Sequence, residues 1–289
     1  MDKKNYPLVS VLMTAYNRGK YIAEAIESVL CSSFTDFELI IVDDASTDTT
    51  AEIARSFQKQ DLRIRVYENE SNLGDYPNRN YAASLAKGKY LKYVDSDDRI
   101  EADGLKTLIE GMEQFPEAGF GICSLKPDAE KPFPYVMQPK EAYEYHFFRQ
   151  RLFHLGPLNV IFVRQAFNNV GGFKPGRMIS DTDMWFRMAL KYPVVLMGDG
   201  IVWQRRHAEQ ELSLQHKYIF EAEKIKWAYL KDPACGLNSM QLQKIKRNRL
   251  KRYAGFIMSG IKRGNILRTI SYLKCFRFVS TINVKRLGK

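Results

Sequence analysis

The chain has 289 residues, which is enough for one large domain or for one domain with an appendage. Hydrophobic residues make up 45% of it and aromatic residues 12%, a globular composition that excludes a low-complexity chain. The net charge is +11, but residues 241–289 hold 14 Lys and Arg and no Asp or Glu, so the first 240 residues hold 30 basic and 33 acidic residues. Because the positive charge belongs to the C-terminal segment, we do not expect the body of the chain to bind nucleic acid.

The cysteines and the apolar segments indicate the cellular compartment of the protein. The four cysteines have neither metal-type spacing nor a disulfide pattern, so a reduced protein accounts for them: Cys31, Cys123, Cys235 and Cys275. The apolar stretch at residues 8–13 is too short for a signal peptide and lacks a cleavage site of small residues. No run approaches the roughly 20 apolar residues needed to cross a bilayer. We therefore expect a cytoplasmic protein.

The first hundred residues alternate between strand and helix patterns. Strands are predicted at residues 8–13, 37–42, 64–67 and 90–94. Helices are predicted at residues 19–30, from a cap at Ser46 or Thr47 to about residue 59, and at 77–86. This alternation predicts an α/β fold with a parallel, doubly wound sheet and helices on both of its faces.

The pattern loosens after residue 100. A helix at residues 103–115 and a strand at 120–124 continue the sheet, and residues 126–157 form an irregular segment with a helix near 140–152. A strand at 160–163, a turn at 171–173, a helix at 181–191 and a strand at 194–197 follow. From about residue 215 the chain is predicted to be helical to its end.

Acidic residues follow two of the predicted strands. Asp43 and Asp44 come after the second strand, and Asp95, Asp97 and Asp98 come after the fourth. The carboxyl ends of parallel strands share one edge, so the two clusters are expected to line one crevice. Crowded carboxylates repel one another unless a cation lies between them, and Mg²⁺ takes one or two carboxylates and fills its shell with water and phosphate oxygens. The alternative is a solvated acidic turn.

A crevice with acids and a cation suits a nucleoside diphosphate. Arg79 could add a contact to a phosphate, and the alternative is a surface salt bridge. Motifs of other nucleotide and hydrolase sites are missing, because no G-x-x-x-x-G-K-[ST], no G-x-G-x-x-G after the first strand and no G-x-S-x-G occurs.

Six segments together resemble the family-2 glycosyltransferases, which have the GT-A fold. They are VSVLMTAYN at 9–17, VDDASTD at 42–48, NLG at 72–74 followed by Arg79 and Asn80, VDSDD at 94–98, VGGF at 170–173 and DTDMWFR at 181–187. The resemblance covers residues 7–215. It implies a GT-A catalytic domain at 1–215, with a nucleotide-sugar-binding half to about 125 and an acceptor half from 126, followed by a basic helical extension at 216–289.

The resemblance also implies an activity. The chain would transfer a sugar, with inversion, from a nucleotide-diphosphate sugar that is UDP-linked to a glycan or a lipid-linked acceptor. The process would be the synthesis of a bacterial-type surface polysaccharide, and the metal would be Mn²⁺ or Mg²⁺. The sequence does not identify the sugar, the base of the nucleotide, the acceptor or the linkage, since side chains of the pocket and not the fold choose among them.

Roles on the donor side are carried over to the matching residues. Thr14, Ala15 and Tyr16 would lie against the nucleoside, and Asp44 would bind the base or ribose with Asp43 nearby. Asp95, Ser96 and Asp97 match the Asp-x-Asp element, in which Asp97 is the expected direct metal ligand and Asp95 the second.

Roles on the acceptor side follow in the same way. Asp181 matches the general base, although this chain has Ser180 where the family often has Glu. If Asp181 only caps a helix, Asp183 is the alternative base. His207, in the element Arg205-Arg206-His207, would complete the metal site, unless it is a solvated loop residue, and Trp185 is expected to be core.

The basic tail predicts two helices, at residues 239–259 and 262–279. Apolar residues form a rough stripe on each: Leu242, Ile245, Leu250, Tyr253, Phe256 and Ile257, then Ile266, Ile270, Leu273 and Phe276. Basic amphipathic helices suit an anionic membrane surface, which would hold the enzyme at the inner face of the cell membrane. The alternative is a helix pair that packs on the catalytic domain.

Two other functions compete. A sugar-1-phosphate nucleotidyltransferase would need a Gly-rich basic loop after the first strand, and residues 14–19 do not supply one. A non-catalytic membrane- or nucleic-acid-binding protein would bind through residues 241–289 without any need for a divalent ion.

Overall fold

The computed structural model describes residues 6–126, 131–176, 178–206 and 215–284. The contacts divide the chain into two units. The sheet unit comprises residues 1–138, 155–177 and 192–206, and the helical unit comprises residues 139–154, 178–191 and 207–289. Two helices from the predicted acceptor half, at 139–148 and 180–191, thus belong to the same unit as the tail helices.

The sheet unit is built on eight strands in the order β3-β2-β1-β4-β8-β6-β9-β7. Their bounds are β1 (Val9–Ala15), β2 (Phe37–Asp43), β3 (Ile64–Glu68), β4 (Tyr90–Tyr93), β6 (Phe120–Ile122), β7 (Tyr135–Met137), β8 (Val160–Val163) and β9 (Val194–Leu196). The first four strands are parallel, whereas β8 runs antiparallel to both β4 and β6, and β7 runs antiparallel to β9. A small sheet pairs β5 (Arg99–Ile100) with β10 (Val202–Trp203).

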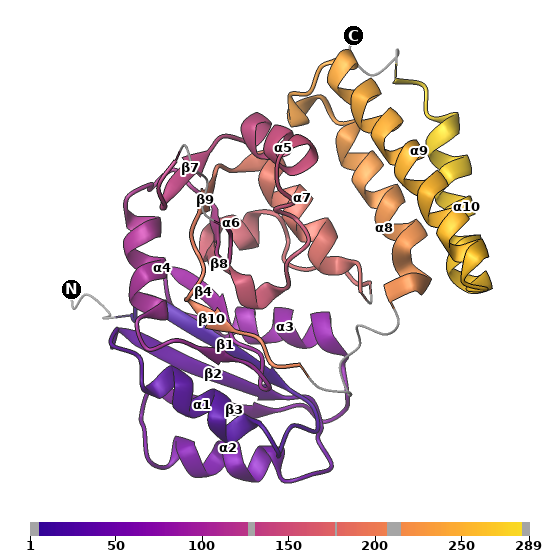
Figure 1. Cartoon of the computed structure of the whole chain (residues 1–289). Helices are drawn as coiled ribbons and strands as arrows, with labels where there is room; N and C mark the ends of the chain where they lie inside the picture. The colour runs from indigo at the N-terminus through magenta and orange to yellow at the C-terminus, as the bar shows by residue number, and fades with distance from the viewer. Residues whose placement is uncertain (1–5, 127–130, 177, 207–214, 285–289) are drawn as a thin grey trace. The chain divides into compact units, whose positions relative to one another are not determined.

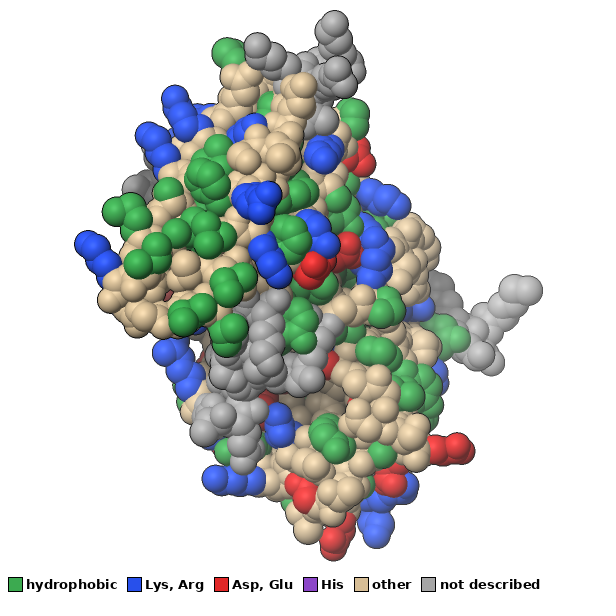
Figure 2. Space-filling model, turned by 90° about the vertical axis from the view of Figure 1, so that its right-hand side faces the viewer, with side chains coloured by type: hydrophobic (Ala, Val, Ile, Leu, Met, Phe, Trp, Pro, Cys, Tyr) green, Lys and Arg blue, Asp and Glu red, His purple; other side chains and the backbone are tan. Residues whose placement is uncertain are grey.

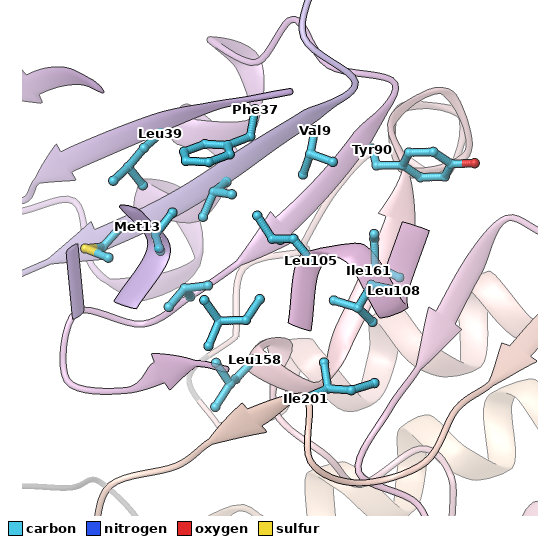
Figure 3. Close-up of a cluster of buried hydrophobic side chains, with 14 of the residues drawn as sticks. Val9, Met13, Phe37, Leu39, Tyr90, Leu105, Leu108, Leu158, Ile161 and Ile201 are labelled. Atoms are coloured by element: carbon cyan, nitrogen blue, oxygen red, sulfur yellow. The ribbon is translucent and has the colours of Figure 1, made fainter. Parts of the chain in front are cut away.

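Helices cover both faces of this sheet, which explains why its strands are almost continuously apolar (Figure 1). One face is covered by α1 (Ile22–Leu30), α2 (Thr50–Gln58) and α4 (Gly104–Glu113), whose apolar side chains join one buried cluster with β1 and β2. The other face carries α3 (Asp75–Ser84) and α6 (Arg164–Asn169), with a cluster of aromatic rings that includes Tyr76, Tyr93 and Phe173. Figure 3 shows the first cluster, in which Val9 of β1 lies beside Phe37 of β2.

The helical unit consists of α5 (Pro139–Phe148), α7 (Ser180–Lys191), α8 (Gln215–Leu230), α9 (Ser239–Lys262) and α10 (Ile266–Thr281). Its interior is aromatic, because His146, Phe153 and Phe186 pack ring against ring with centroids 4.7–5.2 Å apart. Trp185 is 1% exposed, which confirms that it belongs to the core. Among the described residues, no helix is both long and apolar enough to cross a membrane.

Most predicted elements are present, and the exceptions have local causes. Helix α2 begins at Thr50, so the predicted cap at Ser46 or Thr47 is wrong; the Ser46 hydroxyl instead donates to Asp43 Oδ1 at 2.5 Å. The short elements β7 and α6 were not predicted, since three to six residues carry too little periodicity. The predicted helix at 140–152 ends at Phe148, and the tail is helical as expected.

Candidate active site

The two acidic clusters lie at the same edge of the sheet, on either side of β1. Strand β1 runs parallel to β2 and to β4, with Ala15 opposite Asp43 and Leu12 opposite Tyr93. Asp43 and Asp44 therefore follow one neighbour of β1, and Asp95, Asp97 and Asp98 follow the other. The prediction that both clusters share one edge is confirmed.

An arginine from the loop after β1 holds Asp97. Arg18 Nε lies 3.1 Å from Asp97 Oδ2, and its Nη1 donates to the carbonyl oxygens of Tyr16 and Asn17. The contact spans 79 residues of sequence, and our sequence reasoning missed it. The available signal was a basic residue just after a strand whose neighbours both end in acids.

Asp95 is held by a second arginine, Arg79 of α3, from the face of the sheet opposite α1, α2 and α4. Arg79 Nη1 lies 2.7 Å from Asp95 Oδ1, and Arg79 Nε donates to Asp75 Oδ1 at 2.7 Å. The Arg79 side chain is only 9% exposed, which does not fit the alternative of a surface salt bridge, although its partners Asp95 and Asp75 are 23% and 49% exposed. Arg79 therefore fixes Asp95, while its contact with a phosphate stays a prediction.

Asp98 connects this edge to the segment that follows β10. Its Oδ1 accepts the backbone N–H of Arg205 at 2.8 Å, and Arg205 Nε donates to the Asp97 carbonyl at 3.0 Å. Burial, and then the negative charge of Asp95, raises the pKa of Asp98. Asp98 is thus a structural acid, which leaves Asp95 and Asp97 as the ligand candidates. His207 lies outside the described residues.

Asp43 and Asp44 are both buried and organise loops. Asp43 accepts the backbone N–H and the hydroxyl of Ser46, and burial raises its pKa although these bonds oppose the shift. Asp44 Oδ1 accepts from Asn69 Nδ2 at 2.7 Å and from the N–H of Leu73 at 2.8 Å, while Oδ2 accepts from Gly74 at 2.9 Å. A carboxylate offers about four acceptor positions, and these three bonds occupy most of those on Asp44.

The end of β1 presents the residues expected against the nucleoside. Ala15 is buried, Thr14 is half-buried, and Tyr16 is 47% exposed between the two acidic clusters. Asn17 locks this end to the loop after β2, because its N–H donates to Ser46 Oγ at 2.8 Å and its side chain accepts the Thr47 N–H at 2.9 Å. Tyr16 is therefore an exposed aromatic surface on a fixed backbone, next to Asp44.

The two base candidates lie in the helical unit, at the start of α7. Asp183 is buried; Arg187 donates to its Oδ2 from Nη2 at 2.7 Å and from Nε at 3.0 Å, and the Tyr229 hydroxyl donates to its Oδ1 at 2.6 Å. Asp181 is half-buried and accepts the N–H of Thr182 at 2.6 Å. Asp183 therefore has a structural role, as the buried partner of Arg187 and Tyr229, and Asp181 is the better candidate for the general base.

The carboxylates of Asp95 and Asp97 at the sheet edge are oxygen ligands of the kind that suit a hard divalent cation, which the protein would enclose only in part. Among the described residues, no three His, Cys, Asp or Glu side chains are grouped as a metal site. Asp95 Oδ1 is buried against Arg79 Nη1 at 2.7 Å, and Asp97 Oδ2 lies 3.1 Å from Arg18 Nε, so each candidate ligand is already oriented by an arginine. Two carboxylates, with phosphate oxygens and water to complete the shell, are what Mg²⁺-type sites use.

The family model of glycosyl transferase family 2 matches residues 10–171. The chain belongs to that family, and it has the GT-A fold. It is 43% identical over 106 residues to Bacillus subtilis TuaG, provisionally named as a teichuronic acid biosynthesis glycosyltransferase. That match covers 37% of this chain and 42% of TuaG. The chain spans about two fifths of the length of the curated relatives that it first matches.

Solved structures share the fold. S. aureus TarS 1-349 in complex with UDP-GlcNAc matches with a TM-score of 0.60 and 20% identity over 75% of this chain and 66% of that chain. The Pyrobaculum calidifontis mannosyltransferase PcManGT, in complex with GDP-Man and Mn²⁺, matches with a TM-score of 0.61 and 17% identity over 94% and 85%.

The commitment of Asp183 to packing can be tested by mutation. Asp183→Ala should lower stability by about 3–5 kcal/mol, because it leaves Arg187 buried without its carboxylate. Thermal unfolding of the purified chain would measure this change. The matched control Asp199→Ala removes an exposed carboxylate and should stay within about 0.5 kcal/mol. Equal, small effects of both substitutions would contradict the structural role of Asp183.

Proposed function

We propose that this glycosyltransferase inverts the anomeric centre and transfers its sugar from a UDP-linked donor to a glycan or lipid-linked acceptor in surface polysaccharide synthesis. The observation that carries the proposal is the convergence of Asp44 and Asp97 at one sheet edge, on the two sides of the exposed Tyr16. The reaction is assigned to the cytoplasmic face of the membrane, where nucleotide sugars and lipid-linked acceptors meet.

The relatives support this choice of donor and process. TarS was solved with UDP-GlcNAc, and PcManGT was solved with GDP-Man and Mn²⁺, so the fold accommodates a nucleotide-diphosphate sugar. The provisional name of TuaG points to a cell-surface polymer. We choose a UDP-linked donor, like that of the TarS complex, over a GDP-linked one, like that of the PcManGT complex.

On the donor side, each residue has a task that its surroundings permit. The Tyr16 ring would stack on the base, and the remaining acceptor position of Asp44 would bind an N–H of the base or a ribose hydroxyl. Asp97 and Asp95 would hold Mn²⁺ or Mg²⁺, which when bound stabilises the negative charge that develops on the leaving diphosphate. Arg18 and Arg79 keep the two carboxylates in place.

On the acceptor side, Asp181 would act as the general base. Inversion requires that a base takes the proton of the acceptor hydroxyl while that oxygen attacks the anomeric carbon from the side opposite the diphosphate. A positioned carboxylate supplies a factor of about 10²–10⁴ in rate. Asp183 cannot take this role without giving up its bonds to Arg187 and Tyr229.

The competing functions lose support. A nucleotidyltransferase would need a Gly-rich basic loop, whereas the loop that follows β1, at residues 16–19, is tied to the loop after β2 through Asn17 and Gly19. A protein that only binds nucleic acid or membranes through its tail would not need the ion-paired carboxylates at the sheet edge.

The metal role of Asp97 can be tested by calorimetry. Asp97→Asn should abolish the gain in UDP affinity that Mn²⁺ gives to the unaltered chain, a loss of about tenfold or more, because an amide is a poor ligand for hard cations. The control Asp61→Asn breaks a distant ion pair with Arg63 and should keep the full Mn²⁺ effect. An Asp97→Asn variant that still binds UDP more tightly with Mn²⁺ would disprove this role.

The proposed role of Asp181 as general base can be tested by measuring turnover rate and UDP affinity separately. Asp181→Asn should lower kcat about 10²–10⁴-fold and leave the melting temperature and UDP affinity nearly unchanged. Turnover would be followed with a donor identified by melting protection from a panel of nucleotide sugars, and with a lipid extract as acceptor. Parallel losses of melting temperature and turnover would mean that Asp181 is structural.

A further inference from the structure

The helical unit ends in a hairpin whose tip exposes a set of large apolar side chains. Helices α9 and α10 are joined by residues 263–265, and we call residues 258–273 the hairpin tip. Every residue from 261 to 268 is exposed. Six apolar side chains of the tip are 43–70% exposed: Met258, Ile261, Ile266, Leu267, Ile270 and Leu273.

These side chains are not needed to hold the hairpin together. The buried positions of the pair are others: Leu242, Ile245 and Tyr253 on α9, and Thr269, Cys275 and Val279 on α10. The rings of Phe256 and Tyr272 pack across the two helices with centroids 4.8 Å apart. The tip therefore carries apolar surface beyond what the fold uses, and contiguous exposed apolar surface usually marks an interaction site.

This result corrects the stripe expected on the first tail helix. Leu242, Ile245 and Tyr253 were expected to form part of a membrane-facing stripe, but they are at most 5% exposed and belong to the interior of the helical unit. The apolar surface available to a partner is instead concentrated at the tip, at the end of α9 and the start of α10.

The charge around the tip indicates what it binds. Exposed basic side chains surround the apolar ones: Lys262, Arg263, Arg268, Lys274 and Arg277. No Asp or Glu occurs after Asp232, so this surface offers no acid to pair with a second copy of itself. Figure 2 shows hydrophobic side chains interspersed with Lys and Arg over the upper part of the molecule. An anionic lipid surface complements both features, since it accepts apolar side chains below a layer of negative head groups.

We propose that the hairpin tip inserts its apolar side chains into an anionic membrane surface, with the surrounding Lys and Arg against the lipid head groups. This narrows the attachment site from residues 241–289 to residues 258–273. It is independent of the donor assigned above and stands or falls separately from it. It also places the enzyme where a lipid-linked acceptor lies.

Flotation of the full chain with lipid vesicles tests this proposal. The unaltered protein should float with vesicles that contain phosphatidylglycerol, much less with pure phosphatidylcholine, and less at high salt. The double variant Ile266→Ser with Leu267→Ser should lose about tenfold or more of its partition coefficient, because two exposed side chains no longer insert. Both sites are exposed, so the melting temperature should not change.

The control variant removes the same kind of side chain elsewhere. Leu62 and Met240 are 100% and 77% exposed and lie outside the tip, so Leu62→Ser with Met240→Ser should float as the unaltered protein does. The proposal is overturned if the unaltered protein does not float, or if both double variants float equally well. It is also overturned if light scattering shows a dimer that only the tip variant dissociates, without vesicle binding, since the tip would then be an interface between copies.

Discussion

The structure depends on the pairing of two aspartates at the sheet edge with two arginines from different elements. Asp97 meets Arg18 from the loop after β1, and Asp95 meets Arg79 from α3. Without these guanidinium groups, the carboxylates after β4 would repel one another next to the buried Asp98. The same two ion pairs connect the end of β4 to the loop after β1 and to α3. They therefore both balance the negative charge at this edge and fix the positions of its carboxylates.

The sequence predicted the sheet well because the strands that carry the site are apolar and are separated by predicted helices. The acids were found for the same reason, since Asp44 and Asp97 follow strands that a parallel sheet must bring to one edge. Their partners were not found. Arg18 reaches Asp97 across 79 residues, and Asp44 binds the backbone N–H groups of Leu73 and Gly74, and neither contact leaves a periodic trace.

For helix α7 and the tail helices, the sequence indicated the structure but allowed more than one interpretation of it. The spacing of Asp183 and Arg187 is that of an ion pair on one helix face, which would have marked Asp183 as structural before the fold was known. The tail was correctly expected to be helical and basic, but which face of α9 is buried depends on its packing with α8 and α10. The spacing of the apolar residues showed a stripe along α9 but did not show which of its residues are buried.

The central claim is that both acidic clusters serve one nucleotide. A crystal structure of the chain grown with UDP and Mn²⁺, with anomalous scattering to locate the metal, tests it most directly. The account predicts an anomalous peak in contact with Asp97 and with the diphosphate, and a uridine that lies on Tyr16 within hydrogen-bonding distance of Asp44. A nucleotide bound away from this edge, or one bound there with no metal at Asp97, would contradict the account.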